Sequence, residues 1–219
     1  MNYALLTVVT AAEQTALTTV QAFKDEMGIT TADEDVWIEA QINRMSAAIC
    51  SYIDVPAATN GTRTLGRETL SERFRYSECK IVLARVPVSS IVSVTDFSAE
   101  IVDPAEYELD GATGFLWRLT TGTPNNRISW TTENTIVYQA GYLLPGQDGR
   151  DLPYDIEDAA LSMMKSARAS RTRDPLVKSL EVYDVESVSY WVGSTGSNSS
   201  GGLPPDIAAK LDPYRQIFV

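Results

Sequence analysis

Histidine, the side chain best suited to moving protons at neutral pH, is absent from all 219 residues. Without an imidazole, the chain cannot build a Ser-His-Asp or Cys-His nucleophile or an HExxH zinc site. Neither GxxxxGK[ST] nor GxGxxG occurs, so no phosphate-binding loop is visible. Paired carboxylates could still perform acid–base chemistry, but spacing alone does not identify them. We expect no enzyme, and a carboxylate-based hydrolase stays open as an alternative.

The residues most able to bind a metal are three acids, Asp33, Asp35 and Glu39, near the start of an expected helix. Carboxylates in a first turn interact favourably with the helix dipole, and we interpret these acids in that way. Cys50 and Cys79 are too far apart for a CxxC pair and too few for a disulfide framework. We expect two reduced thiols, with Cys50 on a helix, and neither metal nor cofactor.

The composition is that of a globular protein with a strong acidic excess. There are 29 acidic residues against 18 basic ones, which gives a formal charge of -11 and a pI near 4.5. A general nucleic-acid binder needs clustered Lys and Arg, so DNA that meets this chain should not be bound. No apolar stretch approaches the roughly 20 residues of a membrane span, and no basic residue precedes the N-terminal apolar run. We expect a protein made in the cytoplasm that contacts no membrane.

Two helices are predicted near the start of the chain. Thr18 should cap the first, over residues 18–27, with Gly28 ending it. A capping box of Thr31 and Glu34 should begin the second, a rod of about 30 Å. Its apolar residues recur at intervals of three or four: Ile38, Ile42, Met45, Ile49 and Ile53.

The pattern then changes to short β segments, a further helix and a polar linker. Between Pro56 and residue 150, segments such as NTIVYQAGY alternate with turn signals, which predicts five to seven antiparallel strands. The expected class is α+β, a small α-helical bundle with a long antiparallel β-rich insertion and an extended C-terminal arm. The expected order is an N-terminal arm (1–16), a helical hairpin (17–56), the β-rich insertion (57–150), a core helix and β-ribbon (151–192), a flexible Gly/Ser linker (193–202) and a C-terminal arm (203–219).

Basic residues gather at the end of the helix that LPYDIEDAAL begins. They are Lys165, Arg168, Arg171 and Arg173. Cations at this position can interact with the C-terminal dipole of their own helix. An acidic neighbouring subunit or DNA in a channel are the alternatives that stay open.

The chain ends in LDPYRQIFV, so its last three residues, Ile217, Phe218 and Val219, are all apolar. Residues 193–202, GSTGSNSSGG, precede this end and should form a mobile tether. A helical turn over 205–211 is expected beyond it. The apolar end should either fold back onto its own core or dock on a partner, and the tether favours docking.

The order of these elements resembles that of the head-tail connector (adaptor) proteins of tailed bacteriophages and related gene transfer agents. The matching segments are LTTVQAFKDEMGITTADEDVWIEAQINRMSAAICSYID, a strand-rich middle that ends in VYQAGY, LPYDIEDAAL, and LPPDIAAKLDPYR. The similarity spans residues 17–215 and depends on order and spacing rather than on any catalytic motif. The β-rich insertion is longer than in the compact all-helical members.

The resemblance implies a structural role in the virion neck, at the portal vertex. Such proteins form a homo-oligomeric ring, commonly a dodecamer, that joins the portal protein to the head-closure or tail-completion protein while DNA passes through the lumen. The expected portal-binding residues are Leu211, Pro213, Tyr214, Arg215, Ile217, Phe218 and Val219. The four basic residues at 165–173 become candidates for a subunit interface or the DNA channel. A head-closure or tail-completion protein is the nearest alternative.

Overall fold

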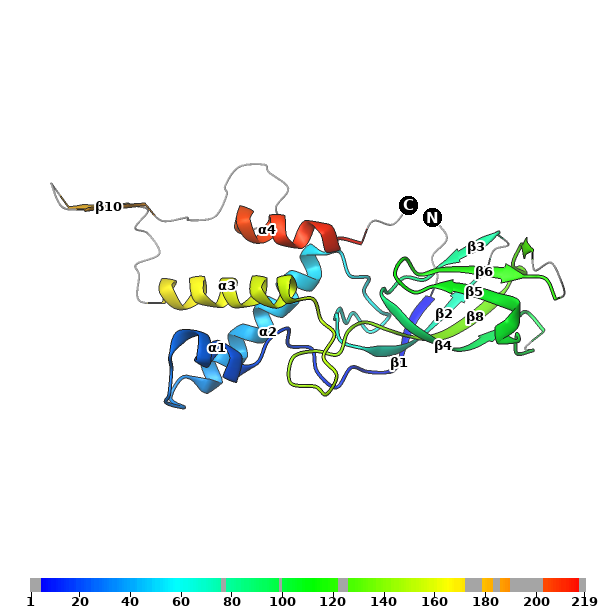
Figure 1. Ribbon diagram of the computed structural model, residues 1–219, viewed down its shortest axis with the longest axis horizontal. Helices are drawn as coiled ribbons and strands as arrows, with labels where there is room; N and C mark the ends of the chain where they lie inside the picture. Colours follow the sequence, from blue (N-terminus) through cyan, green and yellow to red (C-terminus); the bar gives the residue numbers. More distant parts are fainter. Residues whose placement is uncertain are drawn as a thin grey trace. The chain divides into compact units, whose positions relative to one another are not determined.

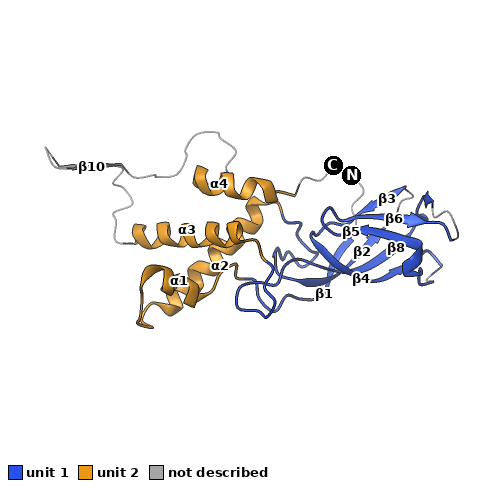
Figure 2. Ribbon diagram, in the orientation of Figure 1, with its two compact units in different colours: residues 1–15, 55–151 blue, residues 16–54, 152–219 orange. Residues whose placement is uncertain are grey.

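The chain divides into two units, one built around two four-stranded antiparallel sheets and one built mainly from helices (Figure 1, Figure 2). The computed structural model describes residues 5–75, 78–98, 100–121, 126–171, 179–182, 186–189 and 203–216. Unit 1 is residues 1–15 with 55–151, and unit 2 is residues 16–54 with 152–219. The expected α+β class is confirmed.

Unit 1 contains two antiparallel sheets. The first has the strand order β1–β2–β8–β4, formed by Leu5–Thr10, Glu68–Phe74, Asn134–Ala140 and Val88–Thr95. The second has the order β3–β6–β5, formed by Lys80–Val82, Phe115–Leu119 and Tyr107–Asp110, and β7 (Arg127–Ile128) also pairs with β6. A 3-10 turn, η1 (Pro104–Glu106), precedes β5.

Strand β1 comes from the segment that was expected to be an N-terminal arm. Leu5 is paired with Arg73 and Val8 with Leu70 across the β1–β2 ladder. Leu6 points into the core and Leu5 is exposed, which is the period-two alternation of a strand with one buried face. Residues 5–10 are therefore part of the sheet, because LLTVVT has the pattern and the β-branched residues of a strand.

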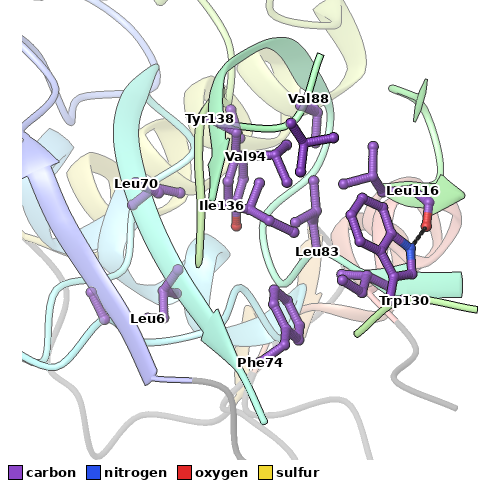
Figure 3. Packing of buried hydrophobic residues seen from close by; sticks show 14 residues of the cluster. Leu6, Leu70, Phe74, Leu83, Val88, Val94, Leu116, Trp130, Ile136 and Tyr138 are labelled. Carbon is purple, nitrogen blue, oxygen red and sulfur yellow. Dashed lines mark hydrogen bonds between the residues drawn. The ribbon is translucent and has the colours of Figure 1, made fainter. Parts of the chain in front are cut away.

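A shared hydrophobic core joins the two sheets (Figure 3). Alternate residues of β2 and β8 point into it, among them Leu70, Ile136 and Tyr138. The second sheet contributes Leu116, whose carbonyl accepts a 3.1 Å hydrogen bond from the indole Nε1 of Trp130. Burying the large Trp130 ring therefore leaves no unmet donor on its indole.

Unit 2 is built from helices. They are α1 (Val20–Met27), α2 (Asp35–Tyr52), α3 (Tyr154–Ser170) and α4 (Pro205–Leu211), followed by the 3-10 turn η2 (Asp212–Tyr214). Phe23, Ile38, Ile42 and Met164 form a buried cluster between α1, α2 and α3. The strands β9 (Ser179–Val182) and β10 (Glu186–Ser189) pair as the antiparallel ribbon that the sequence predicts. No helix within the described ranges is long and apolar enough to cross a membrane.

The helix ends differ in part from the sequence prediction. Thr19, not Thr18, caps α1, and its hydroxyl accepts a 3.0 Å hydrogen bond from the Ala22 amide. Gly28 ends that helix in the left-handed region at φ 65°, as predicted. The predicted box of Thr31 and Glu34 is wrong, because α2 begins at Asp35 and its N-cap residue makes no side-chain capping hydrogen bond.

A charged cluster lies inside the core of unit 1. The Arg85 guanidinium is buried and donates to the carbonyls of Pro56 and Thr64, at 2.7 Å each, and to the Glu68 carboxylate at 3.3 Å. These contacts tie the loop before β2 to the segment before β4. These hydrogen bonds offset the free-energy cost of removing the guanidinium from water.

Glu72 lies in the same core and is 2% exposed. Its Oε2 accepts hydrogen bonds from the Ala84 amide at 3.0 Å and from the Tyr138 hydroxyl at 2.9 Å. Burial raises the pKa of Glu72 from 4.5 to about 7, although both hydrogen bonds act in the opposite direction. The folded protein therefore holds a proton on Glu72 at pH values where the unfolded chain has released it.

This difference makes stability depend on pH. Between about pH 4.5 and 7 the folded state binds more protons at Glu72 than the unfolded state, so the free energy of unfolding should fall as the pH rises through this window. The total loss should be on the order of 3 kcal/mol. Glu72→Gln should remove this part of the slope, because the amide stays neutral and its oxygen can accept both hydrogen bonds.

Urea unfolding of the unaltered protein and of Glu72→Gln, at several pH values from 4.5 to 7.5, measures how the free energy of unfolding depends on pH. Glu100→Gln, at an exposed position of the same unit, is the matched control and should leave the slope in place. A slope that is unchanged in Glu72→Gln would contradict the assignment.

Candidate functional site

The C-terminal segment 203–216, which we call the C-terminal clasp, folds against the helices of its own unit. Its helix α4 packs on α3 (Figure 1). Leu203, Ile207 and Leu211 are all buried, and Leu211 is 0% exposed. Burying three large aliphatic side chains stabilises the attachment by roughly 1.5 to 3 kcal/mol each. The clasp is therefore part of the helical core.

Polar contacts hold the end of the clasp beside the C-terminus of α2. Each of them joins a residue of 212–216 to one of the three residues 52–54. They are Tyr52 hydroxyl to Asp212 Oδ1 at 2.6 Å, Arg215 Nη2 to Asp54 Oδ2 at 2.8 Å, and Gln216 amide to Ile53 carbonyl at 3.0 Å. The hydrogen bond to Asp212 also raises the pKa of the Tyr52 hydroxyl.

A second set of contacts joins the clasp to the first turns of α3. Tyr214 donates a 3.2 Å hydrogen bond to Asp155, and Lys210 forms an ion pair with Asp158. Partial burial, with a smaller contribution from Asp155, raises the pKa of Tyr214. The clasp is thus fixed to two helices that lie about 100 residues apart in the sequence.

These contacts change the expected set of portal-binding residues. Leu211 is buried in its own unit, so its side chain already has a role in the helical core. Tyr214 and Arg215 have partners in their own subunit, whereas Pro213 is exposed. The remaining members, Ile217, Phe218 and Val219, lie outside the described residues, as does the expected linker at 193–202.

The basic residues of α3 also contact their own unit. Lys165 Nζ lies 2.6 Å from Glu26, and Arg168 and Arg171 lie 2.9 and 2.7 Å from Glu34. The Arg171 guanidinium also lies over the Trp37 ring, 4.9 Å from its centroid. These ion pairs lower the charge that the three cations present to a neighbouring subunit or to DNA. Arg173 lies outside the described residues.

The acids and thiols with possible chemistry occupy structural positions. Asp35 forms a 2.8 Å ion pair with Lys24. Within the described part of the chain, no three Cys, Asp or Glu side chains are grouped so as to hold a metal ion. Cys50 lies on a helix, α2, as predicted, and is buried, whereas Cys79 is exposed.

The sequence interpretation missed the residues that hold the clasp, namely Tyr52, Asp54, Asp155 and Asp158. Asp155 and Asp158 lie near the start of α3, where they meet Tyr214 and Lys210 of the clasp. The signal available was the position of these residues at the ends of α2 and α3. Which end the clasp would contact depends on tertiary packing.

Comparisons with known proteins find distant structural likenesses. No protein-family model matches the chain, and no curated protein does. A chain of the virion of a native gene transfer agent particle is similar at 18% identity and a TM-score of 0.48, over 98% of this chain and 97% of that one. A chain of the neck of an empty particle, computed with C6 symmetry, gives 19% and 0.49 over 98% and 96%. A chain of the native neck, computed with C12 symmetry, gives 18% and 0.45 over the same shares. Because these likenesses are distant, we draw the function from the chain's own residues.

The burial of Leu211 predicts that the clasp contributes to stability. Leu211→Ala should lower the free energy of unfolding by about 2 to 5 kcal/mol, because it leaves a cavity between α4 and the helices beneath it. Chemical denaturation of the full chain measures this. Asp206→Ala, at an exposed position of the same helix, is the control and should have a small effect. Equal stability of Leu211→Ala and the unaltered protein would show that the clasp is not attached in solution.

Proposed function

We propose that the protein is the head-tail connector (adaptor) of a tailed phage or gene transfer agent. In this role it forms a ring under the portal in the virion neck, joins the portal to the head-closure or tail-completion protein, and lets DNA pass. Three of the segments that resemble the adaptor family, namely α1 with α2, α3 and the clasp, pack together in unit 2. This packing is the observation that carries the proposal.

The clasp supports a docking role for the last three residues. The Gln216 amide donates a hydrogen bond to the Ile53 carbonyl, which holds the chain up to residue 216 beside the end of α2. Burial of three apolar side chains in a portal groove would contribute roughly 1.5 to 3 kcal/mol each. One such contact is modest against association costs of at least about 4 kcal/mol, but a ring repeats it and gains avidity.

The distribution of charge supports a passage for DNA. The formal charge of -11 belongs to every copy, so a ring would repel phosphates wherever enough acids line its bore. The cations of α3 pair with Glu26 and Glu34, which reduces their pull on a passing duplex. A ring of this kind would let DNA move without holding it.

Electron microscopy of the full chain with the portal protein of the same particle tests the assembly. We expect rings with a central hole, stacked on the portal, and subunits that are monomeric or weakly associated without it. Failure to form a ring on the portal would contradict the proposal. A ring that forms only beneath a separate adaptor protein, and not directly on the portal, would instead indicate a head-closure protein.

Removal of residues 217–219 tests the docking contact. The shortened chain should lose most of its portal binding in a pull-down, because the apolar anchor is missing. Its melting temperature should equal that of the full chain. Undiminished binding would contradict the docking role, and a lowered melting temperature would mean that these residues pack on their own subunit.

A further inference from the structure

The outer face of the second sheet carries an unusual combination of cations and aromatic rings. We call it the cation–aromatic face, and it consists of Lys80, Val82, Phe115, Trp117 and Arg127. Lys80 Nζ lies 3.9 Å from the Phe115 ring centroid, and the Arg127 guanidinium lies 4.0 Å from that of Trp117. The two rings meet edge to face with centroids 5.8 Å apart. The face is therefore an ordered cluster.

Strand alternation explains why this cluster faces outward. Ile81 and Leu116 lie between its members on β3 and β6, and both are fully buried in the core. Neighbouring residues on a strand point to opposite sides, so the aromatic rings lie on the other side of the sheet. Arg127 also pairs with Glu108 at 2.9 Å, and both side chains are about half exposed. Aromatic residues and Arg are enriched at the centres of protein interfaces.

The loop between β4 and η1 presents the opposite chemistry. We call it the acidic knob, and its members are Asp96, Phe97, Glu100, Ile101 and Asp103. Phe97 is 65% exposed and Ile101 is 77% exposed, which is unusual for side chains of this size. Three carboxylates surround these two apolar side chains in the sequence.

Backbone hydrogen bonds hold the knob in shape. The Asp96 amide donates to the Glu100 carbonyl at 3.1 Å, and the Val102 amide donates to the Val94 carbonyl at 2.9 Å. Asp96 Oδ1 also accepts from the amides of Ser98 and Glu100. The two exposed apolar side chains are therefore presented between hydrogen-bonded residues, which reduces the entropy lost on binding.

We propose that the acidic knob of one copy docks on the cation–aromatic face of the next copy, so that these two surfaces of unit 1 form the contact between ring subunits. The knob offers three carboxylates and two apolar side chains, and the face offers Lys80, Arg127 with its partner Glu108, and two aromatic rings. This inference rests on the proposed ring, because it names the surfaces that would close it.

Electrostatics favours a second copy as the occupant. Two copies that each carry -11 repel one another over most of their surface. Association is least opposed where opposite charges meet, and like charges at a contact suppress it. Two different surfaces on one chain also give a head-to-tail contact, which is the type that generates rings when the rotation closes.

Charge reversal on each surface tests the contact. We expect Lys80→Glu and Glu100→Lys, each alone, to raise about tenfold the protein concentration needed for ring formation on the portal. The chain that carries both substitutions should recover most of that loss, because the charges are again opposite. Phe97→Ser should also weaken assembly, and no charge change should rescue it. Counting portals with complete rings by electron microscopy, over a series of protein concentrations, gives the readout.

The controls distinguish a loss of this subunit contact from misfolding and from a failure of the proposed ring. Arg63→Glu changes the net charge as Lys80→Glu does at an exposed position outside both surfaces, and it should assemble normally. Equal melting temperatures exclude misfolding as the cause. Normal rings in both single reversals and in Phe97→Ser would overturn the contact and leave the adaptor role standing. Absence of rings from the unaltered chain would overturn both.

If Lys80→Glu still formed rings but these no longer attached to the portal, the cation–aromatic face would bind the portal rather than a second copy. That result would also overturn the proposal. An equilibrium titration with a single-stranded oligonucleotide checks a nucleic-acid occupant. Binding that Lys80→Glu abolishes, with ring formation intact, would contradict the subunit contact.

Discussion

The attachment of the C-terminal clasp to its own helices is the constraint on which the account depends. Leu211 is fully buried, and the bonds from Arg215 to Asp54 and from Gln216 to Ile53 hold the chain up to residue 216. The clasp therefore joins the end of the sequence to α2 and α3. The segment 203–216, which the sequence suggested as an arm, is therefore held by its own unit.

Most of the described cations of this acidic chain lie close to acidic side chains. Several of them are paired inside the subunit, as Lys165 is with Glu26 and Arg215 with Asp54. Arg85 is buried in the core of unit 1, where it donates hydrogen bonds to backbone carbonyls and to Glu68. Lys80 lies exposed over the Phe115 ring, and Arg127 lies over the Trp117 ring and also pairs with Glu108. In the proposed ring, internal pairing would keep the bore from holding DNA, and the surface that carries Lys80 and Arg127 would join the subunits.

Local signals in the sequence predicted the fold where local interactions decide it. The helix over 205–211 and the ribbon in 179–192 have clear apolar or β-branched patterns, and the structure has both. The box at Thr31 failed because α2 begins only at Asp35, and the Glu34 carboxylate pairs with Arg168 and Arg171, which lie far along the chain. The same limit applies to the clasp. Its apolar helix was visible in the sequence, but its attachment to α2 and α3 depended on distant contacts such as Tyr214 with Asp155.

Hydrogen–deuterium exchange on the full chain, with and without the portal protein, tests the central claim most directly. Protection of amides reports which segments are held in each state. The account predicts that the amides of the clasp are protected in both samples, while those of residues 217–219 become protected only when the portal is present. Rapid exchange of the clasp in the free protein, or protection of residues 217–219 without the portal, would contradict it.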